Sequence, residues 1–277
     1  MKTMNKLAAV ALTLCAATTA NAGKGGSASQ IRQAVASGST DAIIAEVERT
    51  EGLMCSECIS SVQALTTDDR YPVREVAGWW YAKRPQLAHQ MALQMEKDLA
   101  DGDAVHVRNA ADFLGSIREL QALPALRTAM ASGPLNTEAK LALVRAANSL
   151  AHVDGNPILV AGMSDSDATV RTASVDAWRE VIHQTGDIGV VEARLADGDA
   201  NVRAHAATVV GAKHDMNARA TLENLVVNDS DSRVRRNAAY ALGKLGSVES
   251  RAALTLASGD SSVLVKGVAK AALASLK

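Results

Sequence analysis

Two closely spaced cysteines carry the most reactive side chains outside the first 22 residues. They form the motif Cys-Ser-Glu-Cys at Cys55 and Cys58, and the third cysteine is Cys15. A c-type haem requires a histidine directly after the second cysteine, but Ile59 stands there, which excludes this cofactor. Zinc requires two further Cys or His ligands at short spacing, and the sequence offers no second pair of this kind. We therefore predict no metal and no cofactor, and metal binding is the weakest hypothesis for this pair.

A disulfide between Cys55 and Cys58 is the hypothesis that we favour. Thiols three residues apart can meet within one tight turn, and exported proteins encounter an oxidising environment. A redox-active pair is the sharper alternative, because the N-terminus of a helix lowers the pKa of a thiol. Thioredoxin-like enzymes, however, place this motif inside a βαβ pattern, and no strand pattern is visible in the sequence.

Trp79 and Trp80, followed by Tyr81, form the second unusual cluster. Consecutive residues of a helix point about 100° apart, so at least one of the two tryptophans must face away from the core. An exposed tryptophan is a candidate anchor for a protein partner, because interface hot spots are rich in this residue. The competing interpretation, which we prefer, is that these aromatic residues cover the N-terminal end of the fold. Trp178 has the position of a core residue.

Other catalytic patterns are absent from the sequence. It holds neither the nucleophile motif Gly-x-Ser-x-Gly nor a glycine-rich phosphate loop after a predicted strand. The six histidines are scattered, and none precedes a glutamate. These absences favour a binding protein over an enzyme.

A repeat of 32 residues organises almost the whole chain. The phrase Asp-Gly/Ser-Asp begins at residues 101, 165, 197 and 229, which all fall on one 32-residue grid. Extending this grid reaches Asp69 and the Ser-Gly-Ser at 37–39, and Gly133-Pro134 fills the empty slot. Small apolar residues follow each phrase at helical spacing, and a glycine and a second, shorter helix come next. Each unit is therefore predicted to be a helical hairpin, and stacked hairpins share one core.

Charged residues recur with the same 32-residue period. We expect the aspartates to cap the first helix of each unit and the arginines to pair with aspartates of the neighbouring unit. Because the pattern recurs in every good repeat, we interpret it as structural rather than as a ligand-binding ladder. The residues of this predicted ladder are Asp165, Arg171, Asp197, Arg203, Asp229 and Arg235.

The segment from Asp229 to Gly243 reads Asp-x-Asp-x-x-Val-Arg-x-x-Ala-Ala-x-Ala-Leu-Gly and resembles the HEAT-like repeat of the phycobilisome-lyase type. The resemblance implies an all-α superhelix, an α-solenoid of about seven two-helix repeats. The repeat that begins at residue 101 departs from this pattern. Val107 stands where other repeats have arginine, and Arg108 lies one residue later. HEAT-repeat deoxyhypusine hydroxylases bind iron through His-Glu pairs, and this chain has none. A lyase-like enzyme or enzyme subunit remains an alternative function, as does a thiol-disulfide oxidoreductase that uses Cys55 and Cys58.

The N-terminus has the pattern of a secretory signal. Lys2 and Lys6 flank an apolar run at 7–17, and Ala20-Asn21-Ala22 supplies the small residues of a cleavage site. We predict a signal peptide at 1–22, a lead-in segment at 23–36 and a repeat solenoid at 37–277. A lipoprotein anchored through Cys15 is the weaker alternative, because the bulky Leu14 precedes it. The predicted location is periplasmic or secreted.

Composition excludes several partners. Removing residues 1–22 takes two lysines from 29 basic residues and leaves 27 against 30 acidic residues, a net charge of −3. Nucleic acid would require a basic face, and no stretch is long and apolar enough for a predicted membrane span. We therefore predict an exported scaffold that binds a protein or peptide partner through an extended solenoid surface.

Overall fold

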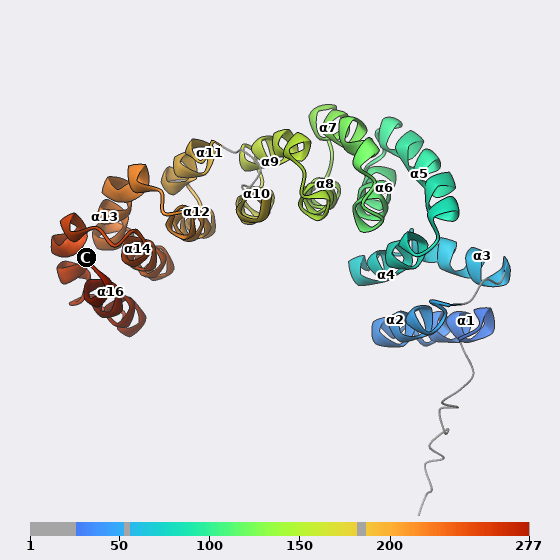
Figure 1. The fold of residues 1–277 in the computed structure, drawn as a ribbon, viewed down its shortest axis with the longest axis horizontal. Helices are drawn as coiled ribbons and strands as arrows, with labels where there is room; N and C mark the ends of the chain where they lie inside the picture. Colours follow the sequence, from blue (N-terminus) through green and yellow to red (C-terminus); the bar gives the residue numbers. More distant parts are fainter. Residues whose placement is uncertain (1–25, 53–55, 182–186, 277) are drawn as a thin grey trace, which may run out of the picture.

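The computed structural model of the chain is a curved two-layer stack of α-helices (Figure 1). It describes residues 26–52, 56–181 and 187–276, and these contain no β-strand. Each hairpin places one helix on the outside of the arc and the next on the inside, so the all-α solenoid predicted from the repeat is confirmed. No helix in the described ranges is long and apolar enough to cross a membrane.

The two layers alternate along the sequence. The outer helices are α1 (Ala28–Ser37), α3 (Ser56–Leu65), α5 (Pro85–Ala100), α7 (Leu123–Ala131), α9 (Asn156–Met163), α11 (Gly189–Glu192), α13 (Arg219–Asn228) and α15 (Arg251–Ala257). The inner helices are α2 (Thr40–Arg49), α4 (Tyr71–Ala82), α6 (Ala104–Ser116), α8 (Thr137–Leu150), α10 (Ala168–Val181), α12 (Ala200–Ala212), α14 (Ser232–Leu245) and α16 (Val263–Ser275). Short 3-10 turns at 120–122, 153–155, 193–196, 216–218 and 248–250 lie beside or within the outer layer.

Two features of the hairpins go beyond the sequence pattern. The segment that precedes the repeats contains α1, which packs on α2 and α3 as a further outer helix. The second helix of a repeat is also not always the shorter one, because α5 has 16 residues and α4 has 12. Pro85 begins α5, and no glycine interrupts this helix before Gly102, where φ is +76°.

Local sequence fixes the helix ends. Asp103, Asp199 and Asp231 cap α6, α12 and α14, because each carboxylate accepts N–H bonds from the first turn. Pro85, Pro124 and Pro157 all lie at the first or second position of an outer helix, where a missing N–H costs nothing. Gly246 ends α14 with φ of +70°, a conformation that favours glycine.

Small residues let neighbouring inner helices approach each other closely. A Cβ added to Gly211 on α12 would lie 2.6 Å from the Cα of Ala241 on α14. A Cβ added to Gly115 on α6 would lie 2.9 Å from the Cα of Ala146 on α8. Any larger side chain at these glycines would therefore push the inner helices apart.

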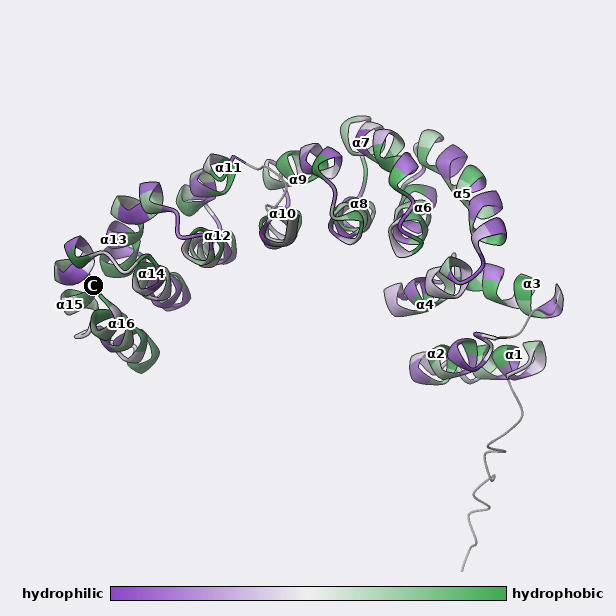
Figure 2. Ribbon diagram, viewed as in Figure 1, coloured by the Kyte–Doolittle hydropathy of each residue, from purple (hydrophilic) through white to green (hydrophobic). Residues whose placement is uncertain are grey.

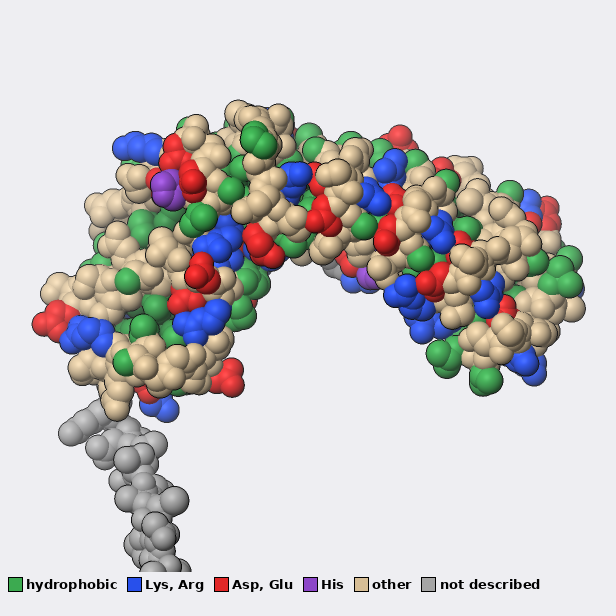
Figure 3. Space-filling view, turned by 180° about the vertical axis from the view of Figure 1, so that it is seen from behind, with side chains coloured by type: hydrophobic (Ala, Val, Ile, Leu, Met, Phe, Trp, Pro, Cys, Tyr) green, Lys and Arg blue, Asp and Glu red, His purple; other side chains and the backbone are tan. Residues whose placement is uncertain are grey.

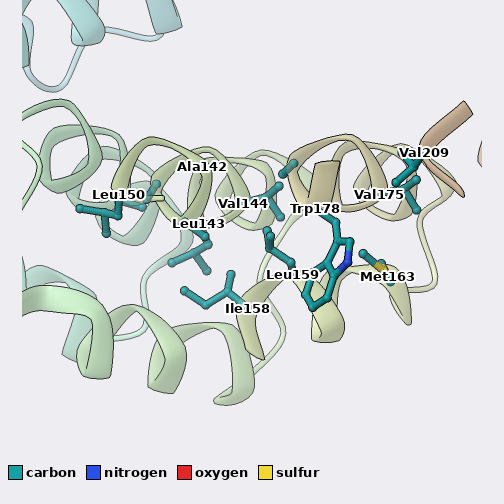
Figure 4. Packing of buried hydrophobic residues seen from close by; sticks show 14 of the residues in the cluster. Ala142, Leu143, Val144, Leu150, Ile158, Leu159, Met163, Val175, Trp178 and Val209 are labelled. Carbon is teal, nitrogen blue, oxygen red and sulfur yellow. The ribbon is translucent and has the colours of Figure 1, made fainter. Parts of the chain in front are cut away.

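The apolar core lies between the two layers. Both hydrophilic and hydrophobic colours occur on each helix, in keeping with amphipathic helices that bury one face (Figure 2). In the middle of the stack, Trp178 of α10 lies beside Leu159 and Met163 of α9 (Figure 4). Trp178 is 2% exposed, which confirms its predicted place in the core.

Candidate binding surface on the inner helices

Each inner helix buries one face and turns the opposite face toward the inside of the arc. From α4 to α14, the side chains of that opposite face are exposed or half-buried, except on α6. We call this the inner surface, and its members are Glu75, Trp79, Leu141, Arg145, Thr172, Asp176, His205, Thr208, Arg236 and Tyr240.

The N-terminal end of the inner surface carries Trp79. Its ring is half-buried, and the Nζ atom of Lys83 lies 5.4 Å from the ring centroid, within range of a cation–π contact. The neighbouring Trp80 is fully buried, so of the two predicted binding tryptophans only Trp79 presents a surface to a partner.

Trp80 instead joins α4 to the preceding hairpin. Its indole N–H donates to Thr50 Oγ1 at 2.9 Å, and the Arg84 guanidinium stacks 3.4 Å from its ring centroid. Arg84 also donates to the backbone carbonyls of Thr50, at 3.0 Å, and Glu51, at 2.6 Å. These contacts hold α4 against the preceding hairpin. Trp80 therefore has a structural role.

The C-terminal end of the inner surface carries Tyr240 on α14. Its side chain is 42% exposed, and Lys244 Nζ lies 5.4 Å from the ring centroid, the same separation as at Trp79. A groove of about 220 Å³ runs between α14 and α16 beside this ring. Its lining consists of Tyr240, Gly243, Lys244, Val268, Ala271, Ala272 and Ser275. The groove is smaller than typical small-molecule pockets of roughly 300–1,000 Å³, and it fits a single side chain of a partner.

A buried charge cluster lies under the N-terminal half of the inner surface. The Asp112 carboxylate of α6 accepts from Arg74 Nη2 at 2.7 Å and from Arg145 Nε at 3.0 Å. The side chains of Arg74 and Asp112 are 2% and 0% exposed. The Arg145 guanidinium also lies 4.3 Å from the ring centroid of Tyr71. Burial of the Tyr71 phenol, together with its hydrogen bond to Glu75, raises the pKa of this group.

Polar pairs continue along the middle of the surface. Asp176 of α10 bonds His205 Nδ1 of α12 at 2.7 Å. Asn237 of α14 donates to Thr208 Oγ1 of α12 at 3.1 Å. These contacts join successive inner helices and leave half-exposed polar atoms available to a partner.

Salt bridges connect consecutive repeats along one edge of the solenoid, where acidic and basic side chains lie side by side along the arc (Figure 3). Arg171, Arg203 and Arg235 bond both carboxylate oxygens of Asp197, Asp229 and Asp260 respectively, at 2.7–3.0 Å. Each arginine also donates Nη1 to two backbone carbonyls of its own turn, as Arg203 does to Asp197 and Gly198. We call each such cation and its carboxylate a rung.

The roles of the paired aspartates differ from the expected caps. In the phrases at 197 and 229, the first aspartate accepts the N–H two residues later and binds the arginine of the preceding repeat, as Asp197 does. The second aspartate is the one that caps the inner helix, as Asp199 does. The first aspartate lies in the turn before the helix, and from there its carboxylate reaches the preceding repeat.

Two cations at the rung position were missing from the predicted ladder, and only one of them, Lys140, binds the first aspartate of the next turn. Lys140 binds the Asp165 carboxylate at 2.6 Å, six residues after Pro134. Arg74 donates Nη1 to the carbonyls of Asp68 and Asp69, at 2.6 and 2.9 Å, as the other arginines do in their own turns. Val73-Arg74 repeats the Val-Arg pair of the C-terminal repeats, and counting from Asp68 instead of Asp69 reveals it.

Cys58 lies in the first turn of α3. Cys58 is fully buried and its sulfur is disulfide-bonded. Cys55 lies outside the described residues, so its pairing with Cys58 stays a prediction. Within the described ranges, no group of three or more His, Cys, Asp or Glu side chains could hold a metal ion.

Charge is distributed unevenly along the arc. Residues 200–277 contain 11 Lys and Arg and six Asp and Glu, a net charge of +5. Residues 23–199 contain 16 basic and 24 acidic residues, a net charge of −8. The Tyr240 end of the inner surface is therefore basic in an otherwise acidic chain.

Comparison with known proteins agrees with this architecture. Residues 188–274 match the family model of HEAT repeats. No curated protein matches the chain in sequence. The C-terminal repeats are HEAT repeats, and the fold of the chain is that of a HEAT-repeat solenoid, as the sequence pattern predicts.

Solved structures share this fold at low sequence identity. The X-ray structure of YibA of E. coli has a TM-score of 0.57 at 12% identity, over 89% of this chain and 92% of that one. The crystal structure of Cex1p has a TM-score of 0.50 at 14% identity, over 84% of this chain and 55% of that one. The complex of CpcE and CpcF of phycocyanin lyase from Nostoc sp. PCC7120 covers 93% of this chain and 97% of that one at 17% identity, but its TM-score of 0.38 carries no functional argument.

Proposed function

We propose that this protein is an exported scaffold that binds a partner protein along its inner surface. The observation that carries the proposal is the pair of aromatic side chains at the two ends of that surface, Trp79 and Tyr240. Each has a lysine four residues later, 5.4 Å from its ring. Trp79 is half-buried and Tyr240 is exposed, and interface hot spots are rich in these two residue types.

The charge of the surface defines the partner further. At the Tyr240 end, neither Arg236 nor Lys244 forms an ion pair with a described residue. Such cations bind carboxylates of a partner without first breaking an internal salt bridge. The partner segment at this end is therefore acidic, and it places one apolar side chain in the groove between α14 and α16.

Export belongs to the proposal as well. Its support is the leader pattern at 1–22, which lies outside the described residues, and the proposed location of the mature chain is the periplasm or the outside of the cell. An oxidising location agrees with a disulfide between Cys55 and Cys58. Cys58 is fully buried, so its sulfur is not accessible to a substrate.

Capture of the partner from a periplasmic extract, followed by titration of the identified protein, tests the proposal. Trp79→Ala with Tyr240→Ala should weaken binding about thirtyfold per aromatic residue, the factor for a hot spot of about 2 kcal/mol. Leu93→Ala with Leu256→Ala is the matched control, because these leucines are 51% and 66% exposed on the outer helices. Equal losses in both double variants would place the partner elsewhere on the solenoid.

A further inference from the structure

The outward face of α16 is open, and it carries aliphatic and basic side chains together. α16 packs on α14 and α15, and no other described helix covers the side that faces away from α14. Val263 and Leu264 at its start are 79% and 65% exposed. The helix contains Lys266 and Lys270 but no acidic residue. Hydrophobic and basic side chains accordingly lie side by side at this end of the arc (Figure 3).

α16 repeats the local geometry of α14, the inner helix before it. The cap residues Asp231 and Ser262 have nearly the same backbone, with φ of −88° and −81° and ψ of 122° and 124°. Each cap N–H bonds the carboxylate of the aspartate two residues earlier, at 2.8 and 2.7 Å. The N–H of Arg235 bonds Asp231 O at 3.1 Å, and the N–H of Lys266 bonds Ser262 O at 3.0 Å. Lys266 therefore occupies the rung position of its repeat.

Lys266 has no rung partner among the described residues. From α8 to α14, the cation at the rung position binds an aspartate of the next turn, as Lys140, Arg171, Arg203 and Arg235 do. No hydrogen bond or ion pair joins the half-buried side chain of Lys266 to any residue in the described ranges. The ammonium group is therefore available to a carboxylate that a partner supplies.

The side of α14 that faces α16 shows what a further helix would meet. Ala239 of α14 is fully buried, and a Cβ added to Gly243, four residues later, would lie 2.9 Å from the Cβ of Ala272 on α16. The caps at 231 and 262 set a register of 31 residues, so Lys270 and Ala274 take the places of Ala239 and Gly243. Both are exposed. A helix that packs here must therefore neutralise a lysine where α16 itself meets an alanine.

Two lysines one helical turn apart define the chemistry of the partner. Residues four apart on a helix share a face, with about 5–6 Å between their Cβ atoms, so two acidic residues at that spacing on a facing helix match Lys266 and Lys270. Gly267 is exposed beside them, and a Cβ there meets nothing within 4 Å, which leaves room for a close approach. A second copy of α16 fits poorly, because it would place lysines against lysines.

We propose that the outward face of α16 binds an acidic α-helix of a partner protein. Two carboxylates of that helix, four residues apart, pair with Lys266 and Lys270, and an apolar side chain beside them covers Val263. The contact continues the internal stack, because the first carboxylate takes the role that Asp260 has in the preceding rung. It uses neither aromatic side chain of the inner surface, so this binding is independent of the proposed function.

Fluorescence anisotropy of a helix-stabilised peptide, titrated with the protein, tests the proposal. The probe is an alanine-based helix with two glutamates four residues apart and a leucine on the same face, and glutamine replaces both glutamates in the control peptide. We expect saturable binding of the glutamate peptide, about tenfold tighter than that of the control, which is the factor for two exposed ion pairs of about 0.7 kcal/mol each. This difference should shrink as the salt concentration rises.

Charge reversal on α16 sharpens the test. Lys266→Glu with Lys270→Glu should abolish binding of the glutamate peptide and create binding of a peptide with lysines at the same two positions. Lys97→Glu with Lys213→Glu is the matched control. It changes the net charge equally, on α5 and directly after α12, where neither lysine forms an ion pair with a described residue. This control should bind the glutamate peptide as the native chain does.

Further variants test the apolar contact and the location of the site. Val263→Ser should weaken peptide binding about threefold, because it removes part of the apolar area that the leucine buries. Leu93→Ser, at a leucine that is 51% exposed on the outer helix α5, should leave binding unchanged. Trp79→Ala with Tyr240→Ala should also bind the peptide normally, because these residues belong to the inner surface.

Five results would overturn the assignment. The first is an absence of saturable binding, and the second is an equal loss in both charge-reversal variants, which would mean a response to net charge alone. Binding of phosphatidylglycerol vesicles in place of the peptide would indicate a lipid surface. Self-association that requires Val263, without peptide binding, would indicate a second copy. Loss of peptide binding in the aromatic double variant would place the peptide on the inner surface.

Discussion

The two halves of the solenoid hold neighbouring repeats together in different ways. In the C-terminal half, Arg171, Arg203 and Arg235 make identical partly exposed rungs to the next repeat. In the N-terminal half, Arg74 turns away from that pattern and pairs with the buried Asp112. A regular repeat can therefore use the same modest contact many times, whereas an irregular one concentrates its charges in a single desolvated cluster. The second arrangement is more fragile, because removing one member leaves a buried charge without its partner.

The largest expected effect is at Asp112. Asp112→Ala should lower the free energy of unfolding by about 3–5 kcal/mol, because Arg74 would then remain buried and uncompensated. Chemical denaturation of the variant and the native protein measures this loss. The double variant Arg74→Met with Asp112→Leu should recover most of it, since a well-packed apolar pair can replace a buried ion pair. If Asp112→Ala costs no more than loss of a C-terminal rung, the contrast between the halves disappears.

Loss of a single rung should lower the free energy of unfolding less than loss of Asp112. Asp229→Ala removes a carboxylate that is 5% exposed and bonded by Arg203, whose side chain is 15% exposed and can turn to solvent. We expect a loss of about 2 kcal/mol, the range for hydrogen bonds to charged groups. The same denaturation experiment, with Asp197→Ala as an equivalent rung, measures it. Unequal losses for these two variants would show that the C-terminal repeats are not energetically alike.

The smallest effect should appear with acid. Hydrogen bonding from Arg235, against the opposing effect of burial, lowers the pKa of Asp260 in the folded protein. A carboxyl with a lowered folded-state pKa stabilises the fold above its unfolded-state pKa of about 4, and this stability is lost as the pH falls through the folded-state value. Each rung should lose about 1 kcal/mol, the upper range for partly exposed pairs. Thermal melts over this pH window should show a smaller acid dependence in Arg235→Gln with Asp260→Asn than in the native chain.

Periodicity was sufficient for the fold and for the regular rungs, because both depend on residues that recur at fixed spacing. Asp165, Asp197 and Asp229 could be found by counting, and their arginines follow at a constant distance. Asp112 could not be found in this way, since its role depends on how α4, α6 and α8 approach one another in space. Trp79 and Trp80 were distinguished only by the packing of Trp80 against Thr50 and Arg84.

The repeat that begins at residue 101 has no arginine at its rung position, and it illustrates a second limit of sequence reasoning. Val107 was visible as a departure from the pattern, but a single substitution does not show whether neighbours close the space. The structure shows that Arg108 turns to Asp69 and that neighbouring residues cover Val107 completely. Departures from a repeat are therefore where the structure adds most to the sequence.

The close helix contacts at Gly115, Gly211 and Gly243 also determine the radius of the arc. Spacing in the inner layer is limited by a missing methyl group at each of these contacts, and the inner helices lie on the concave side of the arc (Figure 1). A stack with tighter spacing on one side must bend toward that side. Changing Gly115 and Gly211 to alanine would consequently open the arc and alter the width of the object that it can enclose, although neither glycine belongs to the inner surface.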